Sequence, residues 1–213
     1  MNNGHAGNRR GERSREEILD AASRVMAARG YAGASISALV AEAGVPKSAI
    51  YHHFHSKGGL LSAVMARGAQ GFFDGMRTAH AEPPEGGEPR DRLAWYLQRT
   101  GEVFAANPDF LRLHMLLILS SEAVEAEVAD IIHDVRAEGR AYMNEMIRSA
   151  FAAEGPTVAR AVADELDYFG IAGFDGAFIA SQAESDRSVT SQMSRLADAL
   201  AALGEAVVAR IRG

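Results

Sequence analysis

Apolar side chains recur at helical spacing along almost the whole chain of 213 residues. The first such run places Ile18, Ala21, Ala22 and Val25 three or four residues apart, which is the spacing of an amphipathic helix. Strict alternation of apolar and polar residues, and the hairpin turns that would join such segments, are not found in the sequence. The pattern therefore predicts an all-α protein.

Glycine, proline and capping residues divide this pattern into about nine helices. The expected helices span roughly 14–29, 35–43, 46–54, 56–80, 91–106, 109–121, 124–152, 157–183 and 188–211. Residues 1–12 are rich in Gly, Asn and Arg, which predicts a disordered basic arm. The clearest linker is 81–90, which holds three of the six prolines.

The formal net charge of −6 argues against a nucleic-acid partner until its distribution is considered. Residues 1–60 hold eight basic and five acidic residues, whereas the remainder holds 14 basic and 23 acidic residues. The two lysines of the chain, Lys47 and Lys57, both lie in the positive segment. This asymmetry indicates that the first 60 residues meet a polyanion.

Other classes of protein are excluded by what the sequence lacks. The chain has no cysteine, so a disulfide scaffold, a thiolate metal site and a cysteine nucleophile are ruled out. GxSxG, P-loop and HExxH motifs are absent, so we expect no catalytic residue, no cofactor and no enzyme. His52, His53 and His55 are spread around a helix and have no neighbouring carboxylate pair, so no metal site is expected.

The N-terminus has no apolar signal-peptide core, and the longest apolar run is Met115–Leu119. A bilayer-spanning helix needs about 20 such residues. We therefore expect a soluble, cytoplasmic protein without a membrane partner.

The segment 35–54 contains two short predicted helices that meet at Gly44. Glycine permits the tight turn of a helix-turn-helix motif. An apolar set can pack these helices on the first helix of the chain: Leu39, Val40, Ala43, Val45, Ile50 and Phe54. The second short helix then exposes polar and small residues: Lys47, Ser48, Ala49, Tyr51, His52 and His53. Small residues let a backbone approach base edges, and longer polar side chains reach phosphates.

The stretch from Arg13 to Leu61 resembles the DNA-binding head of TetR-family transcriptional regulators. The resemblance rests on four motifs in order: Ile18-Leu19-x-Ala21-Ala22, Gly30-Tyr31-x-x-x-Ser35, Gly44-Val45 and Ile50-Tyr51-x-His53-Phe54-x-Ser56-Lys57-x-x-Leu60. It implies a three-helix head with a helix-turn-helix over 13–60. It also implies a C-terminal helical domain for ligand binding and dimerisation over 61–213. Pro46, Ala49 and Gly58-Gly59 depart from the residues typical of the family.

The resemblance also implies a role for each matching residue. Ser35 and Ser37 would touch phosphate or a base, and Tyr51, His52, His53 and Lys57 would hold the phosphate backbone. The base-facing positions would be Pro46, Lys47, Ser48 and Ala49. Arg9, Arg10 and Arg13 would lie along the minor groove, as basic arms do.

The remaining chain holds two sets of mostly apolar residues, and each set has two possible interpretations. The first set forms either a mostly apolar effector pocket with few polar groups or plain core packing. The pocket candidates are Trp95, Arg99, Phe104, Phe110, His114, Leu117, Met143, Met146 and Phe169.

The second set lies on the last two predicted helices, which carry apolar residues on more than one face. This pattern indicates a homodimer interface, and the alternative is that all these residues pack in the core of one chain. Those candidates are Phe174, Ala177, Phe178, Met193, Leu196, Leu200, Leu203 and Val207.

Together these features predict a ligand-responsive transcriptional regulator that binds a palindromic operator in double-stranded DNA as a dimer. A repressor that a small-molecule effector releases from DNA is the expected form. The alternative is a helical small-molecule-binding or scaffolding protein with a non-functional head. The charge asymmetry and the placement of both lysines favour the regulator.

Overall fold

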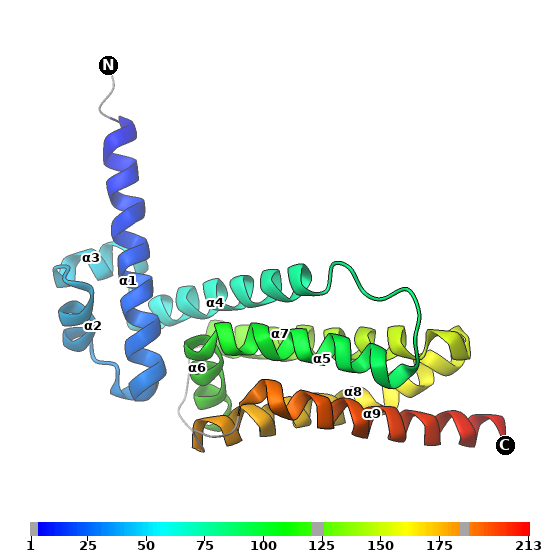
Figure 1. The fold of residues 1–213 in the computed structure, drawn as a ribbon. Coiled ribbons are helices and arrows are strands. Elements are labelled where there is room, and N and C mark those ends of the chain that lie inside the picture. Colours follow the sequence, from blue (N-terminus) through cyan, green and yellow to red (C-terminus); the bar gives the residue numbers. More distant parts are fainter. Residues whose placement is uncertain (1–3, 121–125, 184–187) are drawn as a thin grey trace. The chain divides into compact units, whose positions relative to one another are not determined.

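The computed structural model describes residues 4–120, 126–183 and 188–213, and within them all regular structure is helical (Figure 1). The elements are α1 (Gly4–Gly33), α2 (Ile36–Ala43), α3 (Lys47–Phe54), α4 (Lys57–Ala79), α5 (Pro89–Ala106), α6 (Pro108–Leu119), α7 (Ala126–Ala150), the 3-10 helix η1 (Ala152–Glu154), α8 (Pro156–Ala183) and α9 (Val189–Arg212). The prediction of an all-α fold with about nine helices is confirmed. Element η1 is an addition that the sequence pattern did not indicate.

Helix α1 differs from the expected first helix at its start. It begins at Gly4, so residues 4–12, which were expected to be disordered, are helical, and Ser14 lies inside the helix instead of capping it. Each residue added to an existing helix gains a hydrogen bond without a new nucleus. At the other end Gly30 breaks the helical geometry with φ 72° and ψ 170°, as the sequence predicts.

The chain divides into two compact units. The head unit comprises residues 1–71 and 107–134, and the body unit comprises residues 72–106 and 135–213. The sequence placed a boundary at residue 60, whereas the structure divides the chain inside α4 and inside α7. The head unit is larger than expected because α6 packs against α1.

The head unit is built on the apolar face of α1. Its fully buried side chains include Ile18, Leu19, Met26, Leu39, Ile50, Leu60 and Leu61. The capping predictions for α2 and α4 are confirmed: the Ser35 hydroxyl accepts from the Ala38 amide at 3.2 Å, and the Ser56 hydroxyl accepts from the Gly59 amide at 2.9 Å. Between α2 and α3, Gly44 adopts the left-handed conformation, with φ 64°. These local features set the orientation of α3 on the head.

In the body unit, α9 packs against both α5 and α8 of its own chain. This double contact bears on the residues predicted to form a dimer interface. Seven of them are buried within the single chain: Phe174, Ala177, Phe178, Met193, Leu196, Leu200 and Val207. Leu203, the eighth, is 42% exposed. These seven side chains pack in the core of one chain, and the dimer interface itself stays a prediction.

None of the helices in the described ranges is long and apolar enough to cross a membrane.

Candidate nucleic-acid interface and body cavity

Helix α3 presents one polar face to solvent. Lys47, Ser48, Tyr51 and His52 are exposed, whereas Ile50 and Phe54 are buried against the rest of the head unit. Among the other predicted contact residues, Ser35, Ser37 and Pro46 are exposed and Ala49, His53 and Lys57 are half-buried. The structure thus brings the predicted DNA-contacting residues together at the surface of one unit. Pro46 lies at the N-cap of α3 rather than at its first turn.

The two lysines lie on either side of this face, and each contacts an aromatic ring. Lys47 Nζ lies 5.5 Å from the centroid of the Tyr51 ring, one helical turn further along α3. Lys57 Nζ lies 4.3 Å from the centroid of the Tyr31 ring and donates to the Ala32 carbonyl at 3.4 Å. Such contacts orient an ammonium group without neutralising its charge. Lys57 therefore also ties the start of α4 to the end of α1.

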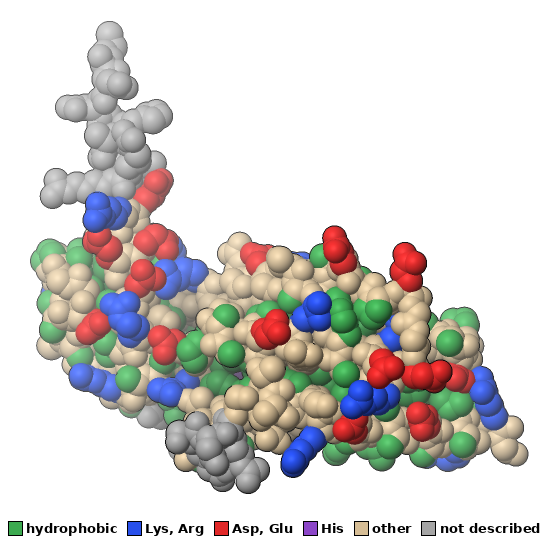
Figure 2. Space-filling model, in the orientation of Figure 1, with side chains coloured by type: hydrophobic (Ala, Val, Ile, Leu, Met, Phe, Trp, Pro, Cys, Tyr) green, Lys and Arg blue, Asp and Glu red, His purple; other side chains and the backbone are tan. Residues whose placement is uncertain are grey.

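Four arginines of the head unit pair with carboxylates, unlike the lysines: Arg13, Arg15, Arg24 and Arg67. Arg13 pairs with Glu17 at 2.9 Å, and Arg24 of α1 pairs with Glu42 of α2 at 3.0 Å. Figure 2 shows the result on the face in view, where Lys/Arg and Asp/Glu side chains are interleaved over the head. Across the described residues, neither lysine forms an ion pair with a carboxylate. Lys47 on the polar face of α3 and Lys57 at the start of α4 are therefore cations that no carboxylate compensates within this part of the structure.

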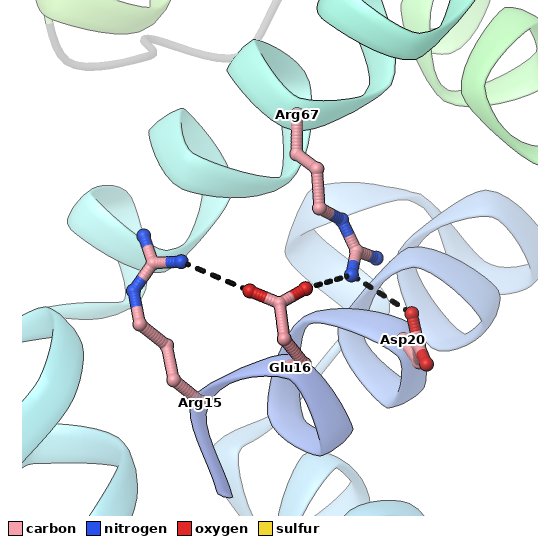
Figure 3. Close-up of polar contacts among 4 residues, drawn as sticks. All are labelled: Arg15, Glu16, Asp20 and Arg67. Atoms are coloured by element: carbon pink, nitrogen blue, oxygen red, sulfur yellow. Dashed lines mark hydrogen bonds and ion pairs between the residues drawn. The ribbon is translucent and has the colours of Figure 1, made fainter. Parts of the chain in front are cut away.

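A network of four charged residues joins α1 to α4 (Figure 3). The Arg67 guanidinium of α4 donates to Glu16 at 2.9 Å and pairs with Asp20 at 2.8 Å. Glu16 also pairs with Arg15 at 3.3 Å, and the Arg15 guanidinium lies 5.3 Å from the centroid of the Phe54 ring at the end of α3. Exposed pairs of this kind contribute only about 0–1 kcal/mol each. Their geometry nevertheless sets how α1 and the end of α3 lie against α4.

His53 has an environment that favours its neutral form. Partial burial lowers the pKa of His53, and the nearby His52 and Arg15 lower it further. A neutral imidazole can donate or accept a hydrogen bond at neutral pH but adds no charge toward DNA. Groups of three or more potential metal ligands are absent among the described residues.

The body unit encloses an apolar cavity of about 40 Å³ between α4, α5, α7 and α8. Its lining comprises Phe72, Phe73, Met76, Thr100, Phe104, Gly139, Tyr142, Met143, Met146, Ile171 and Phe174. Three predicted pocket residues, Phe104, Met143 and Met146, are in this lining. The sequence missed the others because apolar periodicity indicates which side chains turn inward but not which of them border an unfilled space.

The remaining pocket candidates lie elsewhere. Phe110, His114 and Leu117 are buried in α6, which belongs to the head unit. The Arg99 guanidinium lies 4.0 Å from the centroid of the Trp95 ring on α5, and Phe169 is 47% exposed on α8. These residues therefore do not share one cavity in the structure.

His80 stands beside this cavity and connects α4 to α5. Its Nε2 atom donates to the Tyr96 carbonyl at 3.1 Å and lies 3.2 Å from the Thr100 hydroxyl. Burial lowers the pKa of His80, with the Tyr96 hydrogen bond partly opposing this effect. The folded protein therefore holds His80 neutral in a pH range where the unfolded chain binds a proton.

We expect this difference to make the protein less stable as the pH falls through the ordinary histidine pKa of about 6.5. Above that pH His80 is neutral in both the folded and the unfolded chain, so it no longer makes the stability depend on pH. The melting temperature should therefore drop between pH 7.5 and pH 5.5, and the drop should be smaller in His80→Gln. His133→Gln, at an exposed histidine of α7, is the matched control and should melt like the wild type at both values. Equal drops in all three proteins would contradict the role of His80.

The fold and the polar face of α3 define an all-helical protein with the helix-turn-helix head of a DNA-binding transcription regulator. Residues 18–64 match the family model described as "Bacterial regulatory proteins, tetR family". This match covers the head alone, and it identifies residues 18–64 as similar to the DNA-binding segment of that family.

Individual proteins match part of the chain in sequence and most of the chain in structure. The HTH-type transcriptional activator FasR of Mycolicibacterium smegmatis is 41% identical over 78 residues, which cover 34% of this chain and only 36% of FasR. A putative transcriptional regulator from Pseudomonas aeruginosa PAO1 has a TM-score of 0.73 at 21% identity, covering 93% of this chain and 94% of that chain. A putative transcriptional regulator from Saccharomonospora viridis in complex with choline has a TM-score of 0.68 at 23% identity, covering 88% and 95%. These structures share the fold.

Proposed function

We propose that this chain is an effector-responsive regulator that binds a palindromic DNA operator as a homodimer and represses transcription. The observation that carries the proposal is the exposed polar face of α3 with Lys47 on it, together with Lys57 at the start of α4. Neither lysine has a carboxylate partner among the described residues. A DNA-binding head needs cations that are not already neutralised, because each phosphate contact releases a counterion. A protein with this role acts on the chromosome and therefore in the cytoplasm.

In this proposal α3 enters the major groove with its N-terminal residues toward the base edges. Pro46, Lys47, Ser48 and Ala49 face the bases, and Ser37 approaches from the start of α2. Phosphates are held by a second set of residues: Ser35, Tyr51, His52, His53 and Lys57. The side chains of Arg9 and Arg10, expected along the minor groove, lie outside the described residues. Arg13 is held by Glu17 and would have to leave it to contact DNA.

For the homodimer, we assign an interface to the exposed apolar stripe of α8 in place of the buried residues. Phe169, Ala172, Gly176 and Ile179 are exposed and recur three or four residues apart along one side of the helix. Leu203 of α9 is also exposed. A second copy would cover these side chains about a two-fold axis, which makes the interface self-complementary.

Phe169→Glu is the sharpest test of this interface. We expect the dissociation constant of the dimer to rise by about 100-fold, because a buried aromatic anchor contributes about 2–4 kcal/mol and the charge would face its own symmetry mate. Leu119→Glu adds the same charge at another exposed apolar residue, on α6, and should leave the dimer intact. Light scattering after size exclusion measures both. A Phe169→Glu protein that dimerises like the wild type would contradict the assignment.

The effector would occupy the body cavity. Supporting this, the Saccharomonospora viridis regulator of the same fold is in complex with the small molecule choline. An effector releases the operator only if it binds the DNA-free conformation more tightly than the DNA-bound one. Helix α4 contributes residues to both units, so a change at the cavity can reach the head through one continuous helix.

Selection from random double-stranded DNA with the purified full-length chain tests the proposed function. We expect enrichment of a palindrome whose half-sites lie about one or more helical turns apart. Absence of any enriched sequence at low salt would overturn it and favour the scaffolding alternative. A reporter gene behind the selected operator then distinguishes repression from activation, the role that FasR carries in its name. Higher expression in the presence of the protein would replace the repressor with an activator.

A further inference from the structure

The cavity of the body unit has an unusually uniform lining. Phe73 and Tyr142 stack with their centroids 5.7 Å apart and their planes 12° apart, and Phe104 lies 4.9 Å from Phe174. Phe72 meets Phe104 edge-on at 5.3 Å. The lining contains no Asp, Glu, Lys, Arg or His. Its surface is therefore the face and edge of aromatic rings together with methionine side chains.

Such a lining discriminates against charge. An ion moved into an apolar site without a partner loses several kcal/mol of hydration. Arg77 approaches the cavity only through the hydroxyl of Tyr142 and already pairs with Asp74 and Glu138. A charged ligand group would therefore lose hydration without meeting an oppositely charged side chain in the lining.

The lining also contains one buried hydroxyl. Thr100 is 2% exposed, and its hydroxyl donates to the Tyr96 carbonyl at 3.0 Å. Its proton is thus committed. Its oxygen already lies 3.2 Å from His80 Nε2 and, with two lone pairs, can accept one further hydrogen bond. The hydroxyl suits a ligand that carries one donor group and is otherwise apolar.

The cavity is so small that lining side chains must move before a ligand can enter. A cavity of about 150 Å³ holds one benzene ring, so the 40 Å³ here is too small for an aromatic ligand as it stands. Met76, Met143 and Met146 occupy part of the surrounding space, and methionine changes conformation more easily than other apolar residues. Met143 fits against Gly170, where an added Cβ would lie 2.5 Å from its sulfur. These side chains can be displaced without breaking a polar contact other than the 3.7 Å approach of the Thr100 hydroxyl to the Met146 sulfur.

We propose that the effector site of this protein accepts an uncharged aromatic molecule with at most one hydrogen-bond donor, which enters by displacing the methionines of the lining. The regulatory meaning of this site rests on the proposed function, but the binding chemistry does not. The ligand class follows from the ring geometry, the buried hydroxyl of Thr100 and the absence of charged side chains in the lining.

The test uses the full chain and three probes that share one ring system: 2-naphthol, 2-naphthoate and 2-naphthylmethylammonium. Calorimetry and thermal melting at pH 7 without DNA measure binding. We expect 2-naphthol to bind once per chain and raise the melting temperature, and each charged probe to bind at least 10-fold more weakly. Tighter binding of either charged probe, or no binding of 2-naphthol, would overturn the proposal.

Gly139→Leu locates the bound probe. A Cβ at Gly139 meets only Ile171 Cδ1, at 3.9 Å, so a larger side chain can extend into the cavity without a clash at its base. We expect at least 10-fold weaker binding of 2-naphthol in this variant. Gly71→Leu on the same kind of helical site, with open space around it, should bind like the wild type. Unchanged binding in a folded Gly139→Leu protein would overturn the location.

Failure of the proposed function and failure of the proposed ligand class give different experimental results. If the chain enriches no DNA sequence yet binds 2-naphthol as described, the ligand class stands and the regulator does not. If it enriches an operator yet binds none of the probes, the regulator stands and the ligand class is wrong.

Discussion

Lys47→Glu should lower the affinity of the protein for its selected operator by about 100-fold. Lys47 is exposed at the first residue of α3 and has no carboxylate partner among the described residues. Loss of a base contact costs about 1–3 kcal/mol, and the new carboxylate is repelled by the phosphates on both sides of the groove. A total loss of binding free energy near 3 kcal/mol corresponds to an affinity about 100-fold lower.

The same variant should alter sequence preference as well as affinity. A base reader that is removed relaxes the preference at one position of each half-site, whereas a phosphate contact that is removed weakens all sequences alike. Electrophoretic mobility shifts on the selected operator and on its single-base variants measure both effects. An unchanged profile at lower affinity would assign Lys47 to the phosphates.

Arg160→Glu is the matched control for charge. It makes the same change of two charge units at a residue of α8 whose side chain is 78% exposed, and it lies in the body unit. We expect operator affinity within about threefold of the wild type, since Arg160 is not part of the unit that carries α3 and exposed charges are screened at physiological salt. If both variants lose affinity equally, net charge rather than the face of α3 governs binding.

Gly204→Val should lower the free energy of unfolding by about 2–3 kcal/mol. Gly204 is buried in α9, and a Cβ added to it would overlap the ring of Phe151, which is itself 1% exposed. Phe151 lies between α7 and η1, so the clash falls where α9 closes over the rest of the body unit. Overpacking a core of this kind costs about 1–3 kcal/mol.

Urea unfolding of Gly204→Val beside Gly71→Val measures this effect. Gly71 lies on α4 with nothing within 4 Å of an added Cβ, so valine there should be neutral or slightly stabilising. Both variants replace a helical glycine with valine, so they share the change in helix propensity. They differ in whether the added side chain contacts Phe151. A Gly204→Val protein as stable as Gly71→Val would show that Phe151 moves aside without penalty.

The head was largely predictable because its signals are local in sequence. Ser35, Gly44 and Ser56 each act on backbone groups within four residues, by capping a helix or by adopting the left-handed conformation of a tight turn. Such features depend on short-range sterics and hydrogen bonds. The link from Glu16 to Arg67 was not predictable, because the two residues are 51 positions apart and meet only when α4 packs beside α1.

The body shows where periodicity stops being informative. Helix α9 has an apolar stripe that sequence reasoning assigned to a second copy of the chain, yet Leu200 and Met193 are buried in the chain's own core. A periodic apolar stripe indicates that one face of a helix is buried. It does not indicate whether the same chain or a partner chain covers that face. Likewise Phe104, Met143 and Met146 were predicted to line a pocket and do, whereas Phe110, His114 and Leu117 pack in the other unit.

By itself the sequence determined an all-helical fold, the place of the helix-turn-helix and the position of the two lysines, one within this motif and one just after it. These follow from hydrogen-bond geometry and charge within short segments. Only the tertiary structure decided which arginines are neutralised, which aromatic rings enclose a cavity and which side of α8 is left exposed. Those properties depend on contacts between helices far apart in the chain, since the same apolar side chain can fill a core, border a void or face a partner.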